Sequence, residues 1–140
     1  MAGWSLYLDD AGCPVYHYNW MGHNHYVARS STSLSPGTYE VVVDFVYDGG
    51  FGAGGDAVLL VDEKAVAHAR VERTVPFVFS MSGESFDIGM DTGAPVGFYP
   101  HVYRCSAVIH GVTLERLSEP SPDIAALIVE GEFRASLATQ

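Results

Sequence analysis

Alternation of apolar and polar residues is the dominant pattern of this chain. From Tyr39 to Tyr47, Val and aromatic residues occupy every second position of a nine-residue run, and Glu40 and Asp44 fall between them. A period of two over this length predicts a half-buried β-strand. Three other runs also predict strands. In two of them the residues that share one face are Trp4, Leu6 and Leu8, and Ala65, Ala67, Ala69 and Val71. The third is a short apolar strand over Ala57–Asp62.

Turn-forming residues separate these predicted strands. They lie at residues 9–12, 35–37, 48–55 and 62–64. Short strands broken roughly every 8–12 residues are typical of an antiparallel sandwich or barrel. A parallel sheet is not expected, because no ten-residue helical pattern lies between the strands. Over residues 105–117 most of the apolar residues occupy odd-numbered positions before Gly111 and even-numbered positions after it. This pattern predicts a last strand with a β-bulge at Gly111.

The end of the chain has a different pattern. Ser121, Pro122 and Asp123 resemble an N-cap, a first-turn proline and a first-turn acid. Apolar residues at helical spacing follow, at Ile124 and Leu127–Ile128. We therefore expect an all-β sandwich domain over residues 1–118 and a C-terminal extension over 119–140 that forms a short helix on the sandwich.

Composition narrows the function classes. The chain has 140 residues, 48% of them hydrophobic, which fits one domain with a full core. Its net charge of −10 argues against nucleic acid and against an anionic membrane surface, and is explained by solubility or by attraction of cations or a basic partner. The first ten residues lack the pattern of a signal peptide, so we expect a cytoplasmic protein.

Histidines and aromatic residues crowd between Tyr16 and Tyr26. His17, His23 and His25 could together hold a zinc ion. If the segment is a hairpin around Met21, His23 and His25 point the same way, whereas His17 need not. No carboxylate lies nearby in the sequence to orient the imidazoles, so surface histidines on a tyrosine-rich sheet are the favoured interpretation.

Acidic residues offer a second metal hypothesis. Asp87, Asp91 and Asp48 could bind a structural calcium ion through carboxylates and loop carbonyls, although their spacing is not that of an EF-hand. The alternative is a loop held by aspartate side chains that bond to their own backbone. The glycine-rich run at residues 48–55 lacks the lysine of a phosphate loop and predicts a hairpin connection. We expect no cofactor.

Three segments carry a resemblance to a known family. They are YNWMGHNHYVARS at residues 18–30, LSPGTYEVVVDFVYDGGFGAGGDAVLLVD at 34–62 and RVERTVPFVFSMSGESFDIGMDTGAPV at 70–96. Together they resemble the C-terminal domain of bacterial type I arylsulfatases, from about Gly3 to Leu117. The resemblance implies a concanavalin-like β-sandwich (jelly roll). The chain departs from the family at Ala53, at Glu63, where the family has glycine, and at His23 and His25.

The resemblance does not imply sulfatase activity, because the chemistry of these enzymes lies in a preceding catalytic domain. There a C/S-x-P-x-R motif supplies formylglycine. The sequences that follow Cys13 and Cys105 do not match this motif. No C-x-x-C pair exists either, so both cysteines are expected to be small buried hydrophobes. No catalytic residue is therefore predicted.

These observations favour a non-catalytic sandwich that acts by binding. Its docking surface, covered by a neighbour in the parent enzymes, would be covered here by a homodimer or a protein partner. The alternative is a carbohydrate-binding module, for which the candidate stacking residues are Trp4, Tyr16, Tyr18, Trp20 and Tyr26. A hydrolase is the least favoured interpretation, because it would need convergent acids in a deep cleft.

Overall fold

The computed structural model describes residues 2–76 and 86–116, and within these ranges the chain is all-β and antiparallel, with no helix. Three small sheets form, with strand orders β1-β2-β3, β4-β5-β6 and β7-β8. The strands are β1 (Gly3–Leu8), β2 (Pro14–Trp20), β3 (Asn24–Arg29), β4 (Val41–Tyr47), β5 (Gly55–Val61), β6 (Lys64–Val71), β7 (Met90–Asp91) and β8 (Tyr103–Arg104).

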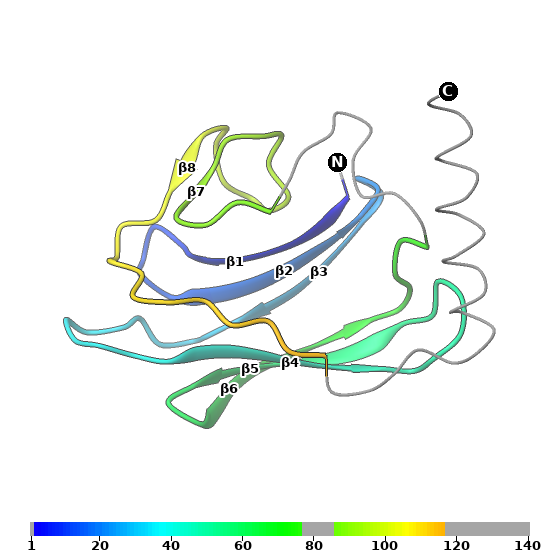
Figure 1. Cartoon of the computed structure of the whole chain (residues 1–140), viewed down its shortest axis with the longest axis horizontal. Helices are drawn as coiled ribbons and strands as arrows, with labels where there is room; N and C mark the ends of the chain where they lie inside the picture. Colours follow the sequence, from blue (N-terminus) through cyan, green and yellow to red (C-terminus); the bar gives the residue numbers. More distant parts are fainter. Residues whose placement is uncertain (1, 77–85, 117–140) are drawn as a thin grey trace.

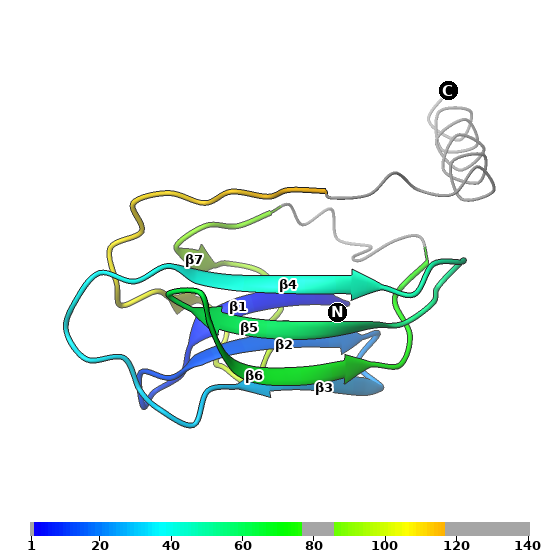
Figure 2. The same cartoon turned by 90° about the horizontal axis from the view of Figure 1, so that it is seen from below.

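The two three-stranded sheets lie one above the other and enclose the core (Figures 1 and 2). Apolar side chains from both sheets meet between the layers, and Leu59 and Val71 are fully buried there. Burial of side chains of this size stabilises a fold by about 1.5–3 kcal/mol each. The buried core cluster consists of Tyr16, Tyr18, Ala28, Ala57, Leu59, Ala69 and Val71.

The alternation predicted for β4 is confirmed. Val41, Val43 and Phe45 pack against the core, opposite Val61, Leu59 and Ala57 of β5. In β6 the prediction needs one correction. Leu59 pairs with Ala67 but Leu60 pairs with Ala65, so Val66 is an extra residue, a β-bulge. The bulge changes the parity of the strand, and Ala65 is therefore exposed instead of sharing the buried face of Ala69 and Val71.

The two layers are closed on one side and open on the other. Strands β3 and β6 approach each other closely. Strands β1 and β4 lie on the opposite side of the two sheets, where the layers stand apart (Figures 1 and 2). Trp4 and Leu6 of β1 pair with Tyr18 and Tyr16, so they belong to the inner face. They nevertheless remain 40% and 38% exposed, because the layers do not close over them.

The predicted last strand over residues 105–117 is wrong for the described part of that range. Residues 105–116 form no strand, and no bulge forms at Gly111. The segment runs beside the open side of the two sheets (Figures 1 and 2). Its apolar residues lie on both parities, and Val108 and Leu114 are 81% and 66% exposed, so neither parity forms a buried face. The predicted C-terminal extension and its helix, residues 119–140, lie outside the described residues.

Two connections constrain the β4–β5–β6 sheet. Where β5 begins, a Cβ added to Gly54 would meet the carbonyl oxygens of Val71 and Glu72, so only glycine allows the chain to pass there. The β5–β6 hairpin turns through Asp62 and Glu63, which have φ values of 48° and 66°. Positive φ at both central residues is the geometry of a type I′ turn.

Candidate functional site

The outer face of the β1-β2-β3 sheet carries an unusual set of polar and aromatic side chains. Pairing places Ser5 beside His17 and Tyr7 beside Val15 on β1 and β2, and Asn19 beside His25 on β2 and β3. These residues alternate with the inner-face residues Tyr16 and Tyr18, so they point away from the core. Residues 90–104, which include β7 and β8, cover this face (Figure 1).

Hydrogen bonds hold the covering segment in place. Asn19 Nδ2 donates to the Val96 carbonyl at 3.1 Å, and the Tyr103 hydroxyl donates to the Leu8 carbonyl at 2.8 Å. The Tyr99 hydroxyl donates to Asp91 Oδ2 at 2.7 Å and lies 3.0 Å from the Ser5 hydroxyl. Burial raises the pKa of Tyr99 to about 12, so this hydroxyl stays protonated near neutral pH. The segment is therefore attached at both ends of the sheet.

A pair of imidazoles, one buried and one exposed, lies against Phe98 of the covering segment. His17 is fully buried, and its Nε2 lies 2.6 Å from His25 Nδ1. Burial, with a further contribution from His25, lowers the pKa of His17 to about 4. Phe98 packs against both rings, with centroid separations of 4.6 Å to His17 and 4.8 Å to His25. The expectation that His17 is a surface residue is therefore wrong.

Beside Phe98 lies a pocket of about 240 Å³ lined mainly by aromatic side chains. Tyr99 and Tyr103 stack with centroids 4.9 Å apart, and Tyr7 packs edge-on against both of them. Phe98 completes the aromatic lining and is 73% exposed. The lining residues are Tyr7, Asp9, Asp10, Val15, Val27, Arg29, Phe98, Tyr99, Pro100 and Tyr103.

Three charged side chains lie in the pocket lining. Arg29 Nε donates to Asp9 Oδ2 at 2.6 Å. Asp9 Oδ1 accepts from the backbone amides of Ala11 and Cys13, which fixes the turn before β2. Burial acts to raise the pKa of Asp9, but the Cys13 amide and the Arg29 guanidinium outweigh it and lower that pKa. Asp10 is exposed and forms no hydrogen bond with the described residues.

The histidine and aspartate metal candidates do not converge. Of the histidines, His25 reaches His17, whereas His23 lies in the β2–β3 turn near Trp20. Within residues 2–76 and 86–116, no three His, Cys, Asp or Glu side chains are grouped so as to hold a metal ion. The aspartates have separate partners, namely Arg70 for Asp48, the Thr92 amide and hydroxyl for Asp87, and Tyr99 and the Gly93 amide for Asp91.

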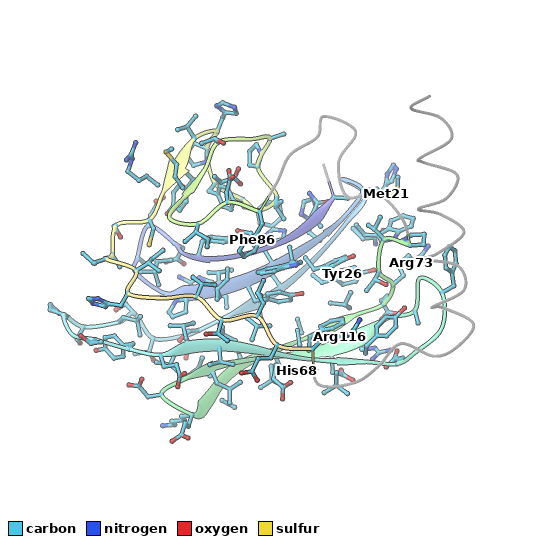
Figure 3. The ribbon with its side chains drawn as sticks, in the orientation of Figure 1. Met21, Tyr26, His68, Arg73, Phe86 and Arg116 are labelled. Atoms are coloured by element: carbon cyan, nitrogen blue, oxygen red, sulfur yellow. The ribbon has the colours of Figure 1, made fainter. Side chains whose placement is uncertain are left out.

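The stacking candidates lie elsewhere than the aromatic pocket. Tyr16 and Tyr18 are 5% and 4% exposed and belong to the core cluster. Tyr26 and Trp20 are partly buried against the same cluster, and Tyr26 lies between the sheets (Figure 3). The Trp20 ring is covered by the Arg73 guanidinium, 4.8 Å from its centroid. Trp4 contacts Phe86, with ring centroids 5.7 Å apart.

The aromatic pocket was not identified from the sequence. Three of its rings come from the segment Phe98–Tyr103, where aromatic residues cluster around Pro100, and Tyr7 comes from β1. The cluster in that segment was an available signal. Tyr7, however, lies on the opposite face of β1 from Trp4 and Leu6, so the apolar alternation of that strand does not single it out.

Two further findings bear on the site. No helix among the described residues is long and apolar enough to cross a membrane. Comparison of the chain with protein-family models, with curated proteins and with solved structures found no match.

Proposed function

We propose that this chain is a non-catalytic, concanavalin-like β-sandwich of jelly-roll topology that acts as a self-association module. The observation that carries the proposal is an apolar strip on the open side of the two layers, defined by Trp4, Leu6, Phe86, Ile88, Ile109 and Val112. Each of these side chains is between 38% and 57% exposed. Exposed apolar surface that is contiguous is typical of an interaction site.

The strip is made of two groups, which follow each other along the chain at Phe86 and Ile88. The Trp4 and Phe86 rings touch, and Phe86 lies beside β1 (Figure 3). Ile88, Ile109 and Val112 line one open hollow of about 410 Å³. A partner side chain could enter this hollow, which would give the association an anchor of the kind that dominates interface energies.

A second copy of the chain is the proposed occupant. The strip borders β1 and β4, which are edge strands of their sheets within the described residues. Residues 105–116 run beside this side without forming a strand, and an edge without a paired strand pairs readily with another strand (Figure 2). On the opposite side, the edge strands β3 and β6 carry the exposed charged side chains of Arg29 and Arg70. Charged side chains protect an edge against pairing, but β4 also carries the exposed Asp44, so it is the apolar strip that makes the open side the favoured interface. A two-fold dimer is the commonest soluble assembly.

Light scattering after gel filtration tests the proposal. The 15.1 kDa chain should elute with twice that mass at micromolar concentration. Ile109→Asp and Val112→Asp place a charge in the hollow and should give monomers. Met21→Asp is the matched control, because Met21 is 53% exposed at the tip of the β2–β3 turn, outside the strip (Figure 3). It should leave the dimer intact.

Two outcomes would contradict self-association through the strip. One is a monomeric wild-type mass at every concentration tested. The other is a dimer that Ile109→Asp and Val112→Asp leave as stable as the control does. Circular dichroism of each variant establishes that a change of mass is not a change of fold.

A further inference from the structure

The aromatic pocket offers mostly carbon surface, because its tyrosine hydroxyls are occupied within the protein. Tyr99 is bonded to Asp91 and Ser5, and Tyr103 to the Leu8 carbonyl. The Phe98 backbone acts on the Tyr7 hydroxyl and partly offsets the rise in pKa that burial causes there. A ligand therefore meets ring carbons, the side chains of Val15 and Val27, and few tyrosine oxygens. A ligand must therefore present an apolar surface to the aromatic side chains of the pocket.

The pocket lining also contains one hydrogen-bond donor and one hydrogen-bond acceptor that are charged and exposed. Arg29 donates Nε to Asp9 and Nη1 to the Ser30 carbonyl, and its side chain remains 48% exposed, with a second amino group that can donate. Asp10 supplies an exposed carboxylate that can only accept when ionised. A ligand that matches both must accept from Arg29 and donate to Asp10.

We propose that this pocket binds a single carbohydrate ring. A sugar ring has an apolar C–H face, which packs on aromatic side chains, and hydroxyl groups, each of which both donates and accepts. A simple organic cation would satisfy Asp10 but would be repelled by Arg29, so it fits the lining less well. The volume of about 240 Å³ lies below the ~300–1,000 Å³ of sites for drug-sized ligands, which favours one ring over a longer chain.

The site is independent of self-association. None of the pocket-lining residues belongs to the apolar strip. Contacts through the strip therefore need none of the pocket residues, and the variants that test the dimer replace none of them. Binding of sugar and formation of dimers can be measured separately, and the failure of one does not imply the failure of the other.

Titration of the full chain with monosaccharides tests the proposal. Glucose, galactose, mannose and N-acetylglucosamine are added one at a time, and amide chemical shifts are followed by NMR. At least one of them should bind with millimolar affinity and shift the amides of residues 7–10 and 98–103. Phe98→Ala should weaken that binding about tenfold, because it removes the exposed ring from the lining. Asp10→Asn should weaken it by a smaller factor.

Phe51→Ala is the matched control. Phe51 is also an exposed phenylalanine, at 51%, but it lies in the β4–β5 loop, outside both the pocket and the apolar strip, so its replacement should leave the sugar affinity unchanged. Equal effects of Phe98→Ala and Phe51→Ala would overturn the proposal. The absence of shifts with all four sugars would also overturn it, as would binding of tetramethylammonium at the same amides in place of the sugars.

Discussion

The imidazoles of His17 and His25 are hydrogen-bonded across neighbouring strands, with His17 Nε2 2.6 Å from His25 Nδ1. One partner is fully buried and the other is exposed. Burial favours the neutral form of His17 and lowers its pKa from 6.5 to about 4, and His25 adds to this effect. Because Phe98 packs against both imidazoles, the protonation of His17 is linked to the packing of Phe98.

The first prediction is that stability falls as the pH falls from about 6.5 to 4. In this window the unfolded chain binds a proton at His17 and the folded chain does not, so protonation favours unfolding. Each pH unit of the window corresponds to about 1.4 kcal/mol, which gives a loss of about 3 kcal/mol. Urea unfolding at several pH values between about 7.5 and 4 measures it.

His17→Gln identifies the source of this pH dependence. The variant should be less stable at neutral pH, because a buried side chain is replaced, but its stability should vary less between pH 6.5 and 4. His23→Gln is the control, since His23 is exposed in the β2–β3 turn, and should retain the wild-type pH dependence. A pH dependence that is identical in His17→Gln and wild type would contradict the assignment.

The second prediction concerns the entry to β5. Gly54→Ala should destabilise the protein by about 2–4 kcal/mol or prevent folding, because its Cβ would overlap backbone carbonyls, including Glu72 O at 2.7 Å. Gly111→Ala is the matched control. Nothing lies within 4 Å of a Cβ at Gly111, so its effect should stay within about 0.5 kcal/mol. Thermal melting of both variants decides, and equal melting temperatures would show that β5 does not pass Val71 and Glu72 this closely.

The third prediction is that Glu63→Gly stabilises the protein. Glu63 has a φ of 66° in the β5–β6 turn, a conformation that costs about 1–2 kcal/mol for a residue with a Cβ. Glycine removes this cost but gains freedom in the unfolded chain, so the net gain should be about 0.5 kcal/mol. Urea unfolding measures it. Glu63→Ala keeps the Cβ and should bring no such gain; a loss of stability in Glu63→Gly would argue against the strained turn.

The fourth prediction concerns activity. Neither cysteine is followed by the sequence that generates formylglycine, so the purified protein should not hydrolyse a generic aryl sulfate. The measurement is release of the phenol from a chromogenic aryl sulfate. Turnover that follows the protein through repeated purification would refute the non-catalytic proposal, whether or not Cys13→Ala or Cys105→Ala abolishes it.

The strands with a clean period of two were predictable from the sequence. In β4 the inward residues Val41, Val43 and Phe45 follow strict alternation, and the structure confirms their face. The bulge at Val66 was not predictable, because Ala65 and Ala67 fit unbroken alternation equally well and only pairing with β5 distinguishes them. The strand predicted around Gly111 was wrong for a related reason. Its apolar residues indicated a strand, but a strand also needs a partner edge.

The candidate site was harder to predict because it depends on contacts distant in sequence. The hairpin around Met21, which the sequence left as one possibility, is present, but the burial of His17 depends on Phe98, which lies far along the chain. The tyrosines nearest the histidines, Tyr16 and Tyr18, are core residues. The alternation of residues along a strand does not show which face of the sheet another segment covers, or which segment that is. The complete pocket could therefore be located only in the structure.

The open side of the two layers also sets the number of copies that can assemble. Each copy presents one apolar strip, whereas the edges of β3 and β6 carry the charges of Arg29 and Arg70. In the proposed dimer each copy contributes its strip, so joining two copies covers both strips and leaves neither of them for a third copy. Growth into a filament would require a second adhesive side, and replacing the charges on β3 and β6 with apolar residues is the change that would create one.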